Sequence, residues 1–107
     1  MKIGQEIMVK EDFKINTMVS DKVKTVKKGD KGFMDSRGFL HLTTGNGIGK
    51  IVKIDDIEVK GYDHRNIASI IFRKLIDVYD LDEFIYYEGF EEAEIIDDIA
   101  DVLMEIL

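Results

Sequence analysis

VKKGDKGFMDSRGFLHLTT, residues 26–44, is the stretch that decides the fold of this chain. The two glycines in residues 29–32 supply the positive φ angles of a sharp turn into a short strand. Residues 35–38 place Asp at the first position and Gly at the left-handed position of a tight hairpin. Residues 39–44 then alternate, so that both leucines fall on one face of a second strand. The stretch therefore predicts two central strands of a small β-barrel.

Strand-like segments flank this hairpin on both sides. Alternating or β-branched residues predict further short strands at residues 6–10, 22–27 and 50–54, with a clipped final strand at 57–59. Residues 11–21 are too polar for a helix face and too long for a tight turn, so we expect them to form a long irregular first loop. The predicted order is five short strands, a long first loop and a final clipped strand.

This pattern resembles an SH3-like barrel, including the small bacterial and phage-borne versions. The residues that carry the resemblance are KGDKGF at 28–33, before the central strand, and DDIEV at 55–59, at the close. The first of these also resembles the glycine motif of KOW-type barrels. The resemblance implies a five-stranded barrel over residues 1–60. Proteins of this fold bind peptides, nucleic acids or other proteins, so the fold does not select among these partners.

A different periodicity begins after Gly61. Asp63 is placed to cap a helix whose apolar residues cover more than one stripe, so we expect that helix to be largely buried. Asp80, with Glu83 three residues later, predicts a capping box for a short second helix, which Gly89 would end. A last helix begins at Glu91 or Glu92. Its apolar residues fall at spacings 0, 1, 4, 7, 8 and 11, and these are Ile95, Ile96, Ile99, Val102, Leu103 and Ile106.

The sequence thus predicts an α+β protein with two parts. Residues 1–60 form the SH3-like β-barrel, and residues 61–107 form two to three helices packed on the barrel or on a second copy of the chain. Nothing in the sequence has the length of a membrane-spanning segment, and the start lacks the apolar core of a signal peptide. Since the chain also has no cysteine, we expect a cytoplasmic protein that does not contact a membrane.

Charge divides the chain along the same line. The net charge is −7. Residues 1–54 carry 11 Lys and Arg against 6 Asp and Glu, a net of +5, whereas residues 55–107 carry 4 against 16, a net of −12. A basic first half is thus followed by an acidic second half, which fits either a charged partner or attraction between the two halves of the chain.

No stretch predicts a catalytic, cofactor or metal site. GNGIGK at residues 45–50 looks at first like a phosphate loop, but its glycine spacing is wrong and no Ser or Thr follows the lysine. A strand also follows it where a helix is needed. His41 and His64 are the only histidines, and their spacing matches no metal motif. We interpret the Asp and Glu side chains as the solvent-exposed faces of helices and not as a catalytic acid/base pair. We therefore expect a protein that is not an enzyme and holds no cofactor.

The function we favour from the sequence is a non-enzymatic, protein-binding or regulatory module. Its size and acidity resemble those of small phage-borne inhibitors that occupy a basic groove on an enzyme, and a phage or other mobile element is the expected carrier. A homodimer through the helices is a further arrangement to test. The predicted contact residues are an aromatic knob and an acidic helix face: Tyr86, Tyr87, Phe90, Glu91, Glu94 and Asp98.

The alternative is a nucleic-acid-binding accessory protein. The basic residues of the barrel would meet the phosphate backbone, and these are Lys24, Lys27, Lys28, Lys31, Arg37, Lys50 and Lys53. Phe33 and Phe39 could stack on bases, although core packing suits them equally well. The overall acidity and the small number of arginines favour the protein-binding hypothesis over this one.

Overall fold

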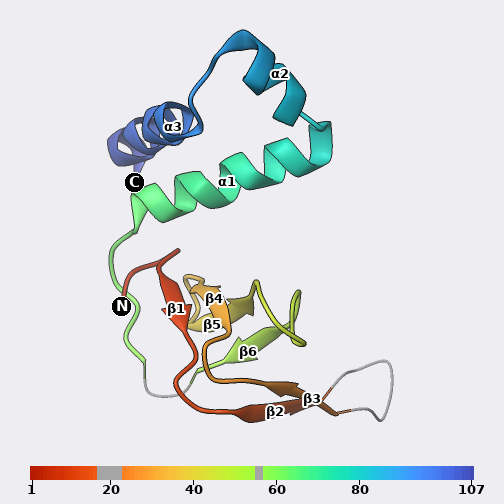
Figure 1. Cartoon of the computed structure of the whole chain (residues 1–107). Helices are drawn as coiled ribbons and strands as arrows, with labels where there is room; N and C mark the ends of the chain where they lie inside the picture. Colours follow the sequence, from red (N-terminus) through yellow and green to blue (C-terminus); the bar gives the residue numbers. More distant parts are fainter. Residues whose placement is uncertain (17–22, 55–56) are drawn as a thin grey trace. The chain divides into compact units, whose positions relative to one another are not determined.

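A computed structural model describes residues 1–16, 23–54 and 57–107. The chain divides into two compact units, Met1–Gly61 and Tyr62–Leu107. Within the described residues, the first unit contains six β-strands and the second three α-helices (Figure 1). The α+β class expected from the sequence is therefore correct.

The strand unit contains two antiparallel sheets. The larger sheet has the order β1-β4-β5-β6, formed by β1 (Glu6–Met8), β4 (Lys31–Met34), β5 (Phe39–Leu42) and β6 (Ile51–Lys53). The smaller sheet is the hairpin of β2 (Phe13–Asn16) and β3 (Val23–Val26). The central hairpin predicted from residues 26–44 is the β4–β5 pair, in which Phe33 lies opposite His41.

Alternation along β4 and β5 builds the core of the strand unit. Met34, Leu40 and Leu42 point inward and are buried together with Val9 and Val26. Gly38 ends the β4–β5 turn with φ +85°, as its position in the hairpin predicts. Gly32, which we expected at a positive φ, instead lies inside β4, where a Cβ would collide with the carbonyl oxygen of His41. The glycine is needed there for close approach of two strands.

The prediction of a closed five-stranded barrel is wrong for the described residues, because their strands form an open sheet of four and a hairpin of two. The predicted loop at 11–21 contains β2, since Phe13 and Lys14 pair with Val26 and Thr25. Its remaining residues, 17–21, and the Asp-Asp turn at 55–56 lie outside the described residues.

Residues 57–59 form no strand. Their segment returns instead to the N-terminus through isolated backbone hydrogen bonds. The Met1 amino group donates to the Glu58 carbonyl over 3.1 Å, and Lys60 N–H donates to the Met1 carbonyl over 2.8 Å.

The helical unit consists of α1 (His64–Tyr79), α2 (Asp82–Glu88) and α3 (Glu92–Ile106). Asp63 caps α1 as predicted, because its carboxylate accepts a hydrogen bond from Asn66 N–H over 3.0 Å. Gly89 ends α2 at φ +74°, also as predicted. The capping box at Asp80 is wrong. Asp80 is the C-terminal cap of α1, at φ +53°, and Leu81 precedes α2 without a side-chain cap.

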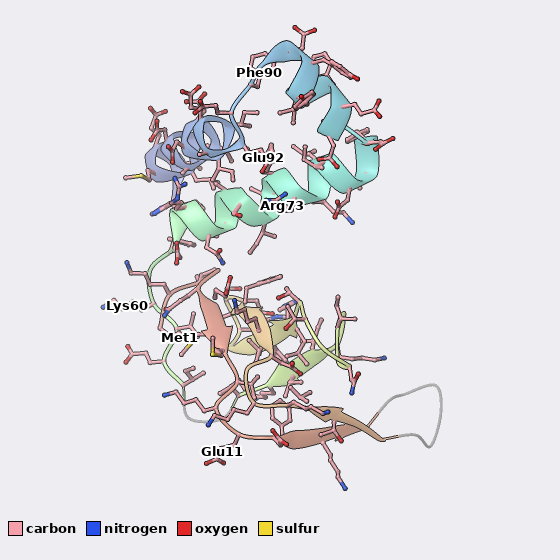
Figure 2. All side chains as sticks on the ribbon, in the orientation of Figure 1. Met1, Glu11, Lys60, Arg73, Phe90 and Glu92 are labelled. Atoms are coloured by element: carbon pink, nitrogen blue, oxygen red, sulfur yellow. The ribbon has the colours of Figure 1, made fainter. Side chains whose placement is uncertain are left out.

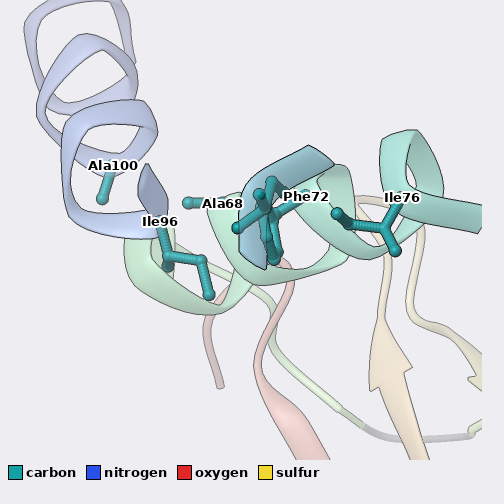
Figure 3. Close-up of a cluster of buried hydrophobic side chains, with 6 residues drawn as sticks. Ala68, Phe72, Ile76, Ile96 and Ala100 are labelled. Atoms are coloured by element: carbon teal, nitrogen blue, oxygen red, sulfur yellow. The ribbon is translucent and has the colours of Figure 1, made fainter. Parts of the chain in front are cut away.

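The helical unit has its own small core, shown in Figure 3. Ala68, Phe72 and Ile76 of α1 pack with Ile96 and Ala100 of α3, and Ile85 of α2 completes the cluster. The two alanines allow α1 and α3 to approach closely. Only three of the sixteen α1 residues are buried, so the expectation that this helix is largely buried is wrong.

Candidate functional site

Four aromatic side chains project from α2 and the turn that follows it. The side chains of Tyr86 and Tyr87 are 80 % and 79 % exposed, and their rings meet edge-on with centroids 5.5 Å apart. Phe84 and Phe90 are also exposed, with ring centroids 6.3 Å apart. The cause is the shortness of α2, which has seven residues and buries Ile85 alone. We call Phe84, Tyr86, Tyr87 and Phe90 the aromatic cluster.

Beside this cluster lies a cleft lined only by apolar side chains, with a volume of about 290 Å³. All three helices and both turns contribute to this apolar cleft, which is lined by Phe72, Leu75, Ile76, Leu81, Phe84, Ile85, Phe90, Ile95 and Ile99. Figure 2 shows Phe90 on the turn between α2 and α3. Since Phe84 and Phe90 belong to both, the aromatic cluster and the apolar cleft form one continuous surface.

The apolar surface continues from the cleft along α3. Ile95 and Ile99 line the cleft, and Val102 and Ile106 follow on the same face at helical spacing. Val102 is 54 % exposed and Ile106 is 73 % exposed. These four residues, named here the apolar row, share one helix face, as the spacing predicted. Half of the row is exposed, because α1 contacts α3 mainly through Ile96 and Ala100.

A row of carboxylates runs beside the apolar row. Glu94, Asp98, Asp101 and Glu105 repeat at the same spacing one position earlier along α3, and all four are exposed. None of these four forms an ion pair within the part of the chain that the structure describes. Elsewhere on the helix, Arg65 pairs with Asp97, and Arg73 pairs with Glu92 over 3.3 Å (Figure 2). This acidic row therefore keeps its negative charge open to solvent.

The six predicted protein-binding residues fall on this surface. Tyr86, Tyr87 and Phe90 belong to the aromatic cluster, and Phe90 also lines the cleft. Glu94 and Asp98 belong to the acidic row, while Glu91 precedes α3 as its N-terminal cap residue. Sequence reasoning missed the apolar cleft. Helical periodicity gives the face on which each residue lies, but not the gap left between three helices of unequal length.

The predicted nucleic-acid residues are more scattered. Lys27 and Lys28 lie exposed in the turn before β4, and Lys31 lies 3.7 Å from Glu6. Arg37 lies 3.8 Å from Asp35 and over the Phe39 ring, which Lys53 also approaches. Lys50 precedes β6 and is half-buried, and Lys24 lies in β3, where its side chain is outside the described structure. Two of these cations are thus close to carboxylates, which lowers the positive charge available to phosphate.

A carboxylate and an imidazole meet at the β4–β5 hairpin. Asp35 accepts hydrogen bonds from the backbone N–H groups of Arg37 (2.8 Å) and Phe39 (3.0 Å), and its second oxygen lies 2.8 Å from His41 Nε2. The His41 ring stacks on Phe33 at 4.8 Å. Burial alone would raise the pKa of Asp35, but the hydrogen bonds outweigh it and lower this pKa from 3.8 to about 2.

The Asp35–His41 pair therefore stabilises the β4–β5 hairpin.

Within the described residues, no group of three His, Cys, Asp or Glu side chains is arranged to hold a metal ion. None of the helices in those same parts combines the length and apolar character that crossing a bilayer requires.

Comparison of the chain with protein-family models, with curated proteins and with solved structures finds no match.

Proposed function

We propose that this protein is a non-enzymatic binding or regulatory module that contacts a protein partner through its helical unit. The observation that carries the proposal is the aromatic cluster, with two adjacent tyrosines about four-fifths exposed. Tyrosine and other aromatic residues are enriched in the cores of protein interfaces, where they bury a large area at a small cost in side-chain entropy. A folded unit that leaves these rings in water gains from a partner that covers them.

The charge around the aromatic cluster supports the same proposal. Glu91, Glu94 and Asp98 lie close along the chain to Phe90 and are exposed. A polar rim around an apolar centre is the usual anatomy of a protein–protein contact. The rim would select a partner with a basic surface and speed its approach.

We also propose that the strand unit is an SH3-like scaffold and that the protein acts in the cytoplasm. The β1-β4-β5-β6 order of the larger sheet, with the β2–β3 hairpin inserted in the chain between β1 and β4, supports the SH3-like arrangement. The return of Glu58 and Lys60 to hydrogen-bond with Met1 supports it further, because it brings the end of the unit back beside the start. A phage or other mobile element is the origin we propose for such a module.

The proposal is tested by quantitative capture from a bacterial lysate with the intact chain as bait. We expect the double variant Tyr86→Ala/Tyr87→Ala to lose a captured protein that the wild-type chain retains. Tyr79→Ala is the matched control, since Tyr79 is an exposed tyrosine on α1 outside the aromatic cluster. Identical captured sets for wild type and double variant would contradict the proposal.

The second candidate, nucleic-acid binding, is favoured by one observation on the strand unit. Arg37 and Lys53 both lie over the Phe39 ring, at 5.2 and 6.0 Å, on the sheet face opposite the buried Leu40. An aromatic ring close to basic side chains is a feature of surfaces that stack single-stranded bases. Such binding should weaken steeply as salt is raised, and Arg37→Ala/Lys53→Ala should weaken it further. No retention on single-stranded DNA at low salt would exclude this candidate.

A further inference from the structure

We infer that the apolar cleft and the apolar row bind an amphipathic α-helix of a partner protein, and that this helix carries Lys or Arg beside its apolar face. The inference rests on the proposed function, since it names the class of partner for the same helical unit. Three features support it: the shape of the apolar surface, the absence of backbone partners in the cleft, and the charge of the border.

The shape matches a helix. The apolar row runs from Ile95 to Ile106, a length of about 16 Å at 1.5 Å per residue. At its Ile95 end it enters the apolar cleft, where Phe84 and Phe90 form part of the wall. A helix with apolar residues at positions i, i+4, i+7 and i+11 presents a stripe of the same length and spacing. One large side chain at the end of that stripe could fill the cleft, as anchors do in helix-in-groove recognition.

The lining of the cleft argues for a helix over an extended peptide. Every lining residue is apolar. An extended peptide placed there would bury backbone N–H and C=O groups with no protein partner, at a cost of roughly 1–3 kcal/mol for each group. A helix satisfies its own backbone hydrogen bonds and offers only side chains to the surface. The occupant that costs least to bury is therefore already helical or becomes helical on binding.

The charge of the border selects a basic helix. Residues 62–107 contain thirteen Asp and Glu against three Lys and Arg. Two of the three bases, Arg65 and Arg73, are paired with Asp97 and Glu92. The acidic row beside the apolar row has no such partner within the described residues. Lys or Arg along one edge of the bound helix would complement it.

The same charge disfavours a second copy of this chain as the occupant. Two helical units meeting through their apolar rows with antiparallel α3 helices would bring two acidic rows together, and in any orientation each unit carries thirteen acids against three bases. Like charges facing each other across an interface cost free energy and slow association. A homodimer therefore becomes an outcome that the experiment must distinguish from the partner helix.

The experiment measures binding of the intact chain to a panel of synthetic helical peptides. Each carries Leu, Phe or Met at i, i+4, i+7 and i+11 with Lys or Arg on the polar side. One control peptide has the same composition in scrambled order, and another has Glu in place of every basic residue. We expect the patterned basic peptides to bind at least about tenfold more tightly than either control, a difference near 1.4 kcal/mol.

Two sets of variants locate the site. Phe84→Ala/Phe90→Ala opens the cleft at exposed positions and should weaken binding about tenfold or more. Tyr79→Ala, which does not line the cleft, should leave the affinity unchanged. Glu94→Gln/Asp98→Asn/Asp101→Asn should reduce both the affinity and its salt dependence. Neutralising three other acids, Asp77→Asn/Glu83→Gln/Glu88→Gln, should do so much less.

Several results would overturn the inference. These are no binding by any patterned peptide, equal binding of patterned and scrambled peptides, equal binding of the Glu-bearing peptide, or no effect of the Phe84/Phe90 variant. Sedimentation showing a wild-type dimer that this variant dissociates would assign the surface to a second copy. If the inference fails in any of these ways while Tyr86→Ala/Tyr87→Ala still loses its captured protein, the proposed function stands without it. If that loss is also absent, both fail.

Discussion

Asp35 shows how one side chain can fix a hairpin. Its carboxylate accepts hydrogen bonds from two backbone N–H groups of the turn and lies next to His41 on β5. The Asp-Ser-Arg-Gly turn was predictable from the sequence, because Asp at the first position and Gly at the fourth favour it. The partnership with His41 was not, since it depends on the strand register that places His41 opposite Phe33. A turn formed by neighbouring residues can therefore be predicted from the sequence, whereas a contact between side chains on different strands cannot.

Asp35 should make stability depend on pH in acid. Its pKa is about 2 in the folded chain against 3.8 ordinarily, so the charged carboxylate favours folding above pH 3.8. That contribution is lost as the pH falls from 3.8 toward 2. Near neutral pH, Asp35→Asn should lower the free energy of unfolding by about 1–2 kcal/mol. Urea unfolding at a series of pH values should show the gap between wild type and variant closing across this window.

A gap that stays constant down to pH 2 would show that Asp35 does not titrate as described. Ser36→Ala is the control for the same hairpin turn, because Ser36 is exposed and carries no charge. This substitution should change stability by less than about 0.5 kcal/mol at every pH.

At the scale of elements, the two long helices begin in different ways. Asp63 caps α1 through its side chain, whereas Glu91 occupies the same position before α3 without a side-chain hydrogen bond. The sequence indicated both helix starts, because Asp is a favoured cap residue and glutamates favour a first turn. It misplaced Asp80, whose carboxylate suggested a helix start. The residue instead takes the left-handed conformation that ends α1, a role that Asp can also fill.

The caps give a matched pair of substitutions. Asp63→Ala should destabilise the helical unit by about 1 kcal/mol, because Asn66 N–H loses its acceptor. Glu91→Ala removes a side chain that makes no cap hydrogen bond, so it should cost no more than a few tenths of a kcal/mol. Thermal melts followed by circular dichroism at 222 nm measure both. Equal losses for the two variants would contradict the assigned roles.

Across the whole molecule, each unit has a separate hydrophobic cluster. Val9, Val26, Met34, Leu40 and Leu42 form one, and the other contains Phe72 and residues of all three helices. The change of periodicity near Gly61 predicted this change from strands to helices. The open sheet, the exposed apolar row and the cleft were not predictable. They depend on how far elements approach one another, which a one-dimensional pattern does not contain.

Separate clusters predict separate responses to core truncation. Phe72→Ala should cost about 3–5 kcal/mol in the helical unit, because Phe72 is 3 % exposed. Met34→Ala should cost about 2–5 kcal/mol in the strand unit. Hydrogen exchange read residue by residue should show Phe72→Ala lowering protection mainly in the helices and Met34→Ala mainly in β4 and β5. Equal loss throughout the chain after either substitution would contradict this expectation.

The placement of the tyrosines has a practical consequence. The chain has four tyrosines and no tryptophan, and Tyr62, Tyr79, Tyr86 and Tyr87 all belong to the helical unit. Tyrosine emission of the unlabelled chain, excited at wavelengths beyond the absorption of phenylalanine, therefore arises from that unit alone. A ligand that covers Tyr86 and Tyr87 should change this emission without any attached dye.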